Sequence, residues 1–247
     1  MKTVDTTARD ANPYLGGARV GVILPSLNST TEADFAWLAP RGISFHAARI
    51  PFTRTTAEDL AAMNRGVADA ARLLATIPPD LVAYACTSGS FVGGVAAGEA
   101  LAAEIAAITQ CPVVTTSGAM VAALKSLGIS RLALATPYIE AVTASEADFL
   151  RDTGVDVVAT ACLGLIGPTV RDTTRERIVA VARAADRPEA EAVFVSCTDL
   201  RAFEAVAEME EALGKPVLTS NQVTLWGILE RLGHPAAVPG AGRLLAT

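Results

Sequence analysis

Two cysteines in this chain have the residue type and the sequence setting for chemistry. Cys86 lies in LVAYACTSGSFVGG, residues 81–94, and Cys197 lies in AVFVSCTDL, residues 192–200. Each stretch predicts a short buried strand that ends in Cys-Thr and opens into a polar or glycine-led turn. The two thiols are 197 − 86 = 111 residues apart. If they face each other, they can move a proton at one carbon from both sides, or add to a double bond while the partner supplies a proton.

The neighbours of each thiol indicate unequal roles. Each thiol precedes a predicted helix N-terminus, whose free N–H groups favour the thiolate and predict a lowered thiol pKa. Thr87 and Ser88 can offer hydroxyl and backbone donors to a carboxylate, and Thr198 can do the same at the second thiol. Asp199 would disfavour a thiolate at Cys197 if its side chain points inward. We therefore predict that Cys86 is the charged nucleophile and that Cys197 carries the proton.

Other chemistries have little support in the sequence. The two histidines, His46 and His234, lie far apart and outside any motif, which gives a Ser/His/Asp triad or a zinc site no basis. VGGVAAG at 92–98 lacks the dinucleotide fingerprint, and VPGAGRLL at 238–245 lacks the phosphate-loop lysine. We predict no cofactor and no metal.

The remaining cysteines take a structural interpretation. Cys111 and Cys162 have no counterpart in the other half of the chain, so we expect them to be buried or incidental. A disulfide between Cys86 and Cys197 is conceivable in an oxidised sample, although a reducing compartment disfavours it.

Two similar halves must position the two thiols. Strands are predicted at 19–24, 44–50, 81–86 and 112–115 in the first half and at 131–136, 156–162, 192–197 and 216–219 in the second. Helices are predicted at 57–74, 92–109, 119–127, 140–152, 173–184, 202–213 and 224–232, with a further one capped by Ser29, Thr30 or Thr31. Landmarks recur in order: Val20 and Ala133 are 133 − 20 = 113 residues apart.

This order predicts an α/β fold of two pseudo-symmetric lobes, each a mostly parallel four-stranded sheet flanked by helices. Ligands of such sheets bind beyond the carboxyl ends of the strands, so the active site is expected in the cleft between the lobes. The expected domain limits are a mobile leader at 1–17, a first lobe at 18–117, a second lobe at 118–220, and a C-terminal helix and tail at 221–247 that pack back on the lobes.

The composition limits the classes of molecule that this protein is expected to bind. A net charge of −6 without Lys/Arg blocks argues against nucleic acid and anionic membranes. Residues 81–98 carry no formal charge, but their glycines and hydroxyls indicate a strand–turn–helix unit and not a membrane span. The start shows no signal-peptide pattern, and the four cysteines form no disulfide framework. We expect a cytoplasmic protein that binds a small carboxylate or dicarboxylate, as a homo-oligomer of two or more copies.

The motifs resemble a known family. LPSLNSTTE after the first strand, YACTSGS and VSCTDL at the thiols, LATPY at 134–138 and VPGAGRLL at the tail resemble the aspartate/glutamate racemase superfamily, in the branch of maleate cis-trans isomerase and arylmalonate decarboxylase. The resemblance covers about residues 18–245. It implies a cofactor-independent two-cysteine isomerase, with maleate-to-fumarate conversion by thiolate addition, bond rotation and elimination as the first interpretation.

The resemblance also assigns residues. Cys86 matches the attacking cysteine and Cys197 matches the cysteine that exchanges the proton. Asn28 and Tyr138 match residues that bind substrate carboxylates, and Ser26, Thr87, Ser88 and Thr198 complete the predicted substrate-binding set.

Departures from the isomerase pattern keep alternatives open. In maleate isomerases the segment after the first cysteine is apolar, whereas here it is TSGS, and the asparagine expected near Gly167 and Pro168 is missing. CTSGS and SCTDLRA also resemble the ectoine-utilisation proteins of this branch, which implies racemisation of an amino-acid derivative. Decarboxylases of the branch keep only the second cysteine, so decarboxylation of a substituted malonate ranks lower. The alternative outside catalysis is a protein that binds a small anion.

Overall fold

The computed structural model describes residues 17–234, 238 and 240–246. The predicted leader, apart from Gly17, lies outside the described residues. The strands are β1 (Ala18–Pro25), β2 (Ile43–Ile50), β3 (Leu81–Tyr84), β4 (Val113–Thr115), β5 (Arg131–Thr136), β6 (Asp156–Cys162), β7 (Ala192–Val195) and β8 (Val217–Thr219). The helices are α1 (Thr31–Leu38), α2 (Ala57–Asn64), α3 (Val67–Ala75), α4 (Thr87–Phe91), α5 (Gly94–Thr109), α6 (Thr116–Ser126), α7 (Glu140–Asp152), α8 (Arg175–Ala185), α9 (Val206–Leu213) and α10 (Ser220–Leu232). Short 3₁₀ turns occur at η2 (Gly167–Val170), η3 (Phe203–Ala205) and η4 (Arg243–Leu245).

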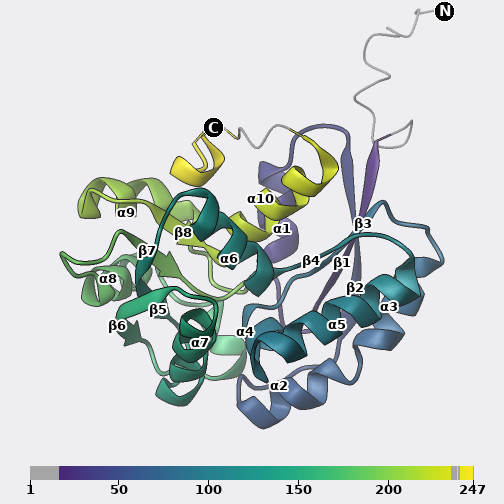
Figure 1. Ribbon diagram of the computed structural model, residues 1–247, viewed down its shortest axis with the longest axis horizontal. Helices are drawn as coiled ribbons and strands as arrows, with labels where there is room; N and C mark the ends of the chain where they lie inside the picture. The colour runs from purple at the N-terminus through teal and green to yellow at the C-terminus, as the bar shows by residue number, and fades with distance from the viewer. Residues whose placement is uncertain (1–16, 235–237, 239, 247) are drawn as a thin grey trace, which may run out of the picture.

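Two four-stranded sheets with the same topology form the framework. Their strand orders are β2-β1-β3-β4 and β6-β5-β7-β8, and every strand pair is parallel. The central strands β3 and β7 are buried along their whole length, because helices cover both faces of each sheet. The two sheets lie in separate lobes (Figure 1). The predicted fold of two similar α/β lobes is confirmed.

The two lobes share one core. A single cluster of buried apolar side chains runs from β1 through α6 and β5 to α10, while a smaller cluster lies between β3 and the helices α2, α3 and α5. Helix α10 packs along α6 and also touches β3, β4 and α1 (Figure 1). The expected limit between residues 117 and 118 falls inside α6, so the division into 18–117, 118–220 and 221–247 stays a prediction.

The predicted helix 57–74 is two helices. Helix α2 ends at Asn64 and α3 begins at Val67. The amides of Arg65 and Gly66 bond back three residues, and a Cβ on Gly66 would come within 2.8 Å of Ile50 on β2. The chain therefore tightens at this glycine so that both helices can pack on the sheet.

Two further expectations about helices need correction. The segment predicted as one helix at 92–109 contains a turn at Gly93, with φ +89°, and its helix α5 begins only after that turn. A separate short helix, α4, comes before it and has Cys86 as its N-cap. Helix α1 has Thr30 at its N-cap without a side-chain cap. Instead, Asn28 Oδ1 accepts hydrogen bonds from the Thr30 and Thr31 amides at 3.1 and 3.0 Å.

No helix among residues 17–234 and the described part of the tail is both long and apolar enough to cross a membrane. The uncharged stretch 81–98 is divided among β3, α4 and the first turn of α5.

Candidate active site

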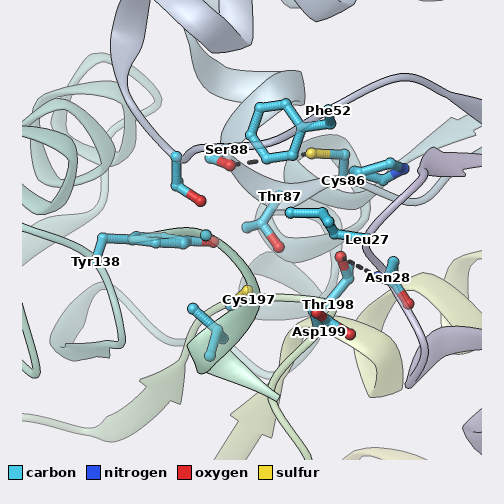
Figure 2. A pocket seen from close by; sticks show the side chains of 14 residues that line it. Leu27, Asn28, Phe52, Cys86, Thr87, Ser88, Tyr138, Cys197, Thr198 and Asp199 are labelled. Carbon is cyan, nitrogen blue, oxygen red and sulfur yellow. Dashed lines mark hydrogen bonds between the residues drawn. The ribbon is translucent and has the colours of Figure 1, made fainter. Parts of the chain in front are cut away.

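One pocket opens at the carboxyl ends of the strands and receives both predicted thiols. Cys86 follows β3 of the first sheet and Cys197 follows β7 of the second. Figure 2 shows them on opposite walls, with the Tyr138 ring entering between them. The lining residues are Pro25, Leu27, Asn28, Phe52, Thr55, Cys86, Thr87, Ser88, Tyr138, Gly167, Val170, Cys197, Thr198 and Asp199. The prediction of one cleft with a thiol from each half therefore describes the geometry correctly.

Cys86 is the N-cap residue of α4. Its Sγ accepts a hydrogen bond from the Gly89 amide at 3.3 Å and lies 3.9 Å from Ser88 Oγ. Burial nevertheless raises the pKa of the Cys86 thiol to about 11, against the opposing effect of these hydrogen bonds. The expectation of a lowered pKa is therefore wrong, because the cost of removing the thiolate from water exceeds the help from the helix N-terminus.

Cys197 lies in a different local structure. No helix follows it directly: the chain turns through residues 198–200 before η3 and α9 begin. Its backbone has φ +96°, a conformation that costs a non-glycine residue on the order of 1 kcal/mol or more. Burial, and then the Asp199 carboxylate, raise the pKa of this thiol to about 12. The predicted helix dipole at Cys197 is absent, whereas the predicted opposing effect of Asp199 is present.

Asn28 holds the two lobes together at the edge of the pocket. Its Nδ2 donates to Thr31 Oγ1 at 3.0 Å and to Thr198 Oγ1 at 3.1 Å, while its Oδ1 caps α1. The Asn28 side-chain amide is therefore fully engaged in hydrogen bonds, and Figure 2 shows the one to Thr198. A role in binding a carboxylate stays a prediction, and it requires the Nδ2 group to exchange one of these partners for the substrate.

A residue that sequence patterns did not single out, Ser220, connects the two thiol segments. Thr87 Oγ1 donates to Ser220 Oγ at 2.8 Å, and the Cys197 amide donates to the same Ser220 oxygen at 2.9 Å. Thr198 adds a second bridge, from its Oγ1 to the carbonyl of Ala85 at 3.3 Å. These bonds fix the Cys86 and Cys197 segments relative to each other.

A second buried network was also missed. Asn221 donates to Asp34 Oδ2 at 2.7 Å and to the Thr198 carbonyl at 2.9 Å, and its Oδ1 accepts from Thr31 Oγ1 at 3.1 Å. Burial raises the pKa of Asp34 to about 6. The SNQ sequence at the start of α10 is the one local signal that could have identified these residues, since three polar side chains in a row seldom begin a buried helix.

Tyr138 lines the pocket, and its hydroxyl contacts a buried polar group formed by Ser196 and Glu146. Ser196 Oγ lies 3.4 Å from the Tyr138 hydroxyl and donates to Glu146 Oε1 at 2.8 Å. Glu146 is fully buried, and its Oε2 has no hydrogen-bond partner among the described residues. Burial raises the pKa of Glu146 to about 8, so this carboxyl is mostly neutral at pH 7.

Glu146 makes the stability of the fold depend on pH. Its folded pKa of about 8 lies above the ordinary glutamate value of 4.5, so between these two pH values the unfolded chain releases a proton that the folded chain keeps. Stability therefore falls as pH rises through this window, by an amount on the order of a few kcal/mol. We expect Glu146→Gln to remove most of this fall, so that the variant melts above the wild type at pH 8 and close to it at pH 4.

Thermal melting of both proteins across this pH range checks the expectation. Exposed Glu99→Gln, on α5, is the matched control and should follow the wild-type profile. Equal slopes for Glu146→Gln and the wild type would show that Glu146 is already ionised in the fold.

The remaining predicted residues divide between the pocket and its surroundings. Thr87, Ser88 and Thr198 line the pocket, but Ser26 does not: its Oγ donates to the Phe52 carbonyl and accepts from the Phe52 amide, at 3.2 and 3.0 Å. Ser26 therefore positions Phe52, which sequence patterns did not single out.

Asp199 lines the pocket while accepting from the Ser29 amide at 2.8 Å. Cys111 and Cys162 are not among the pocket-lining residues, and within the described residues no three His, Cys, Asp or Glu side chains gather as metal ligands would.

Comparison with known proteins identifies similar molecules over nearly the whole chain. The sequence profile described as arylmalonate decarboxylase matches residues 20–245. The chain is 32% identical to a maleate isomerase of Nocardia farcinica, over 94% of this chain and 96% of that protein. It is also 32% identical to an arylmalonate decarboxylase of Bordetella bronchiseptica, over 91% and 95%. A cysteine-to-serine mutant of the Nocardia farcinica isomerase, with a covalently bound succinylcysteine intermediate, superposes with a TM-score of 0.90 at 29% identity, covering 94% of this chain and 99% of that one.

Proposed function

This chain belongs to the arylmalonate decarboxylase family, and we propose that it is a cofactor-independent isomerase that converts maleate, or a closely related small carboxylate, by two-cysteine chemistry. One observation supports the proposal above all others: thiols from two different sheets face one pocket from opposite walls. A decarboxylation that protonates a carbon from one side needs one acid, whereas addition followed by elimination uses both thiols.

In the proposed reaction the Cys86 thiolate attacks one carbon of the double bond. The S–C bond forms as the π electrons move to the neighbouring carbon, which takes the proton of the Cys197 thiol. The former double bond is now single and can rotate. Cys197 thiolate then removes the proton, the double bond re-forms, and the C–S bond breaks to release the trans acid and the Cys86 thiolate. Both thiols return to their starting states, so the cycle balances without a cofactor.

The substrate carboxylates would be held by neutral donors. The pocket-lining residues include no Lys or Arg, but Ser88 and Tyr138 offer hydroxyls, and the Thr198 hydroxyl would have to leave the Ala85 carbonyl to join them. The amides of Thr87 and Ser88, at the start of α4, have no hydrogen-bond partner among the described residues. Such fixed donors in a site without bulk water can bind an anion strongly without a formal positive charge.

Asp199 favours a second candidate, racemisation of an amino-acid derivative. Among the described residues that line the pocket it is the one acidic side chain, and a cationic nitrogen on the substrate would complement it, whereas a second carboxylate would be repelled. In this reaction one thiolate removes the proton from the stereocentre and the opposite thiol returns one from the other face.

Proton NMR in D₂O separates these reactions. The protein is incubated with maleate, with amino-acid derivatives that carry one carboxylate, and with an arylmalonate. Fumarate formation from maleate supports the first proposal, deuterium at a stereocentre supports racemisation, and loss of a carboxylate identifies a decarboxylase. If none of these compounds is converted, and none of them blocks alkylation of Cys86, the enzymatic proposal is wrong.

A further inference from the structure

On the side of Cys86 away from the pocket lies a buried tyrosine that the proposed reaction does not use. Tyr84 lies two residues before Cys86, so both side chains point to the same face of the first sheet. Both belong to the smaller apolar cluster, beneath α2 and α5. Tyr84 is completely buried, and its hydroxyl donates to Asn64 Oδ1 on α2 at 2.5 Å.

Gly89 shows how closely the Tyr84 hydroxyl approaches the sulfur. A Cβ placed on Gly89 would lie 2.3 Å from the Tyr84 hydroxyl oxygen and 3.0 Å from Cys86 Sγ. The two polar atoms thus share the space that a side chain at this position would fill. Asn64 completes the group, because its Nδ2 donates to the Gly89 carbonyl at 2.8 Å while the Gly89 amide donates to the sulfur. The glycine of TSGS is therefore required for packing around the nucleophile.

We propose that Tyr84 and Asn64 form a switchable hydrogen-bond relay behind Cys86: the Tyr84 O–H donates to Asn64 when Cys86 is a thiol and turns to the sulfur when Cys86 is a thiolate. The proton stays on the tyrosine oxygen throughout, so Tyr84 is a positioning residue that stabilises the charged sulfur. The inference deepens the proposed function, since it rests on Cys86 acting as the nucleophile.

Charge and burial agree with this arrangement. Burial, and then the Cys86 charge, raise the pKa of Tyr84 well above its usual value, so its hydroxyl remains a donor. A hydrogen bond from Tyr84 is among the effects that lower the pKa of Cys86 against the cost of burial. The other titratable groups around the sulfur, on the pocket side, are Cys197, Tyr138 and Asp199. All three are acids whose charged form is an anion, so none of them offers Cys86 a cation.

The second lobe has no tyrosine at the position equivalent to Tyr84. Val195 occupies the position of Tyr84, two residues before Cys197, and Cys197 has the Asp199 carboxylate as a neighbour instead. The relay therefore gives a structural reason why the Cys86 thiolate is better stabilised than the Cys197 thiolate, although the two sheets have the same topology.

The test uses two substitutions that should act in opposite directions. Alkylation of Cys86 by iodoacetamide is followed from about pH 7 to pH 10, by mass spectrometry of its peptide, in the full-length protein without substrate. Tyr84→Phe removes the donor to the thiolate and should raise the pKa of Cys86 by about one unit, which is about tenfold slower alkylation at a fixed pH below the pKa. Asn64→Leu removes the acceptor that favours the thiol state, so alkylation should become faster.

Thr109→Val is the matched control, because it removes a buried hydroxyl from α5 beside Cys111 and should leave the Cys86 profile unchanged. If the pH profile of Cys86 alkylation shifts in the same direction in both variants, or does not shift, the relay is overturned. If Tyr84→Phe does not fold, Asn64→Leu alone decides: faster alkylation supports the relay, and unchanged or slower alkylation overturns it. Because the assay contains no substrate, opposite shifts without any turnover would retain the relay and reject the proposed reaction. Turnover of substrate with unchanged alkylation profiles would reject the relay and retain the proposed reaction.

Discussion

Replacing Cys86 with serine is expected to reduce kcat/KM for the substrate identified by NMR by a factor on the order of 10³ or more. The nucleophile must be charged when it attacks. A thiol with a pKa of about 11 in this buried position supplies a small but usable fraction of thiolate, whereas a serine hydroxyl at the same place supplies essentially none. Serine keeps the acceptor for the Gly89 amide, so α4 should remain in place.

Steady-state kinetics by NMR or ultraviolet absorbance measures the loss, with thermal melting to show that the variant is folded. Cys111→Ser is the matched control: Cys111 is partly exposed, is not a pocket-lining residue and donates to Thr109, so turnover should be unchanged. Activity of the folded Cys86→Ser protein within tenfold of the wild type would exclude thiolate attack by Cys86.

The strand pattern was readable from the sequence because it depends on local composition. The predicted limits of β5, β6 and α7 agree with the structure, and the recurring Cys-Thr pair located the third strand of each lobe. Short apolar runs bounded by Pro, Gly and Asp are local signals, and a parallel α/β arrangement leaves few alternatives for joining them. The same reasoning placed Cys86 and Cys197 at one cleft, whereas Tyr138, which also lines the pocket, was expected there only from the family resemblance.

What the sequence did not show depends on contacts between distant segments. Ser220 joins Thr87 to Cys197, and Asn221 reaches Asp34, across separations of 133 and 187 residues. No periodicity in a single sequence encodes such pairs. The expectation for the thiol pKa of Cys86 fails for the same reason: the helix N-terminus after Cys86 is a local feature, whereas the burial that outweighs it comes from packing with α2 and α5, which are distant in the sequence.

Replacing Cys197 with serine is expected to abolish the trans product and to leave a covalent adduct on Cys86. Cys86 can still attack, and a water molecule can supply one proton to the carbanion, leaving a hydroxide ion that exchanges into the solvent. Without the Cys197 thiolate, however, no group on that wall is basic enough to remove the proton again, so elimination fails.

Intact-protein mass spectrometry after incubation with maleate should show Cys197→Ser heavier by one molecule of maleic acid, with the added mass on the peptide that contains Cys86. The double variant Cys86→Ser, Cys197→Ser is the matched control and should gain no mass. The structure makes the two single variants unequal, because Gly89, Ser88 and Tyr84 surround Cys86 with donors while Asp199 adds negative charge beside Cys197. An adduct on Cys197 in the Cys86→Ser protein, with none on Cys86 in the Cys197→Ser protein, would reverse the assignment of nucleophile and proton carrier.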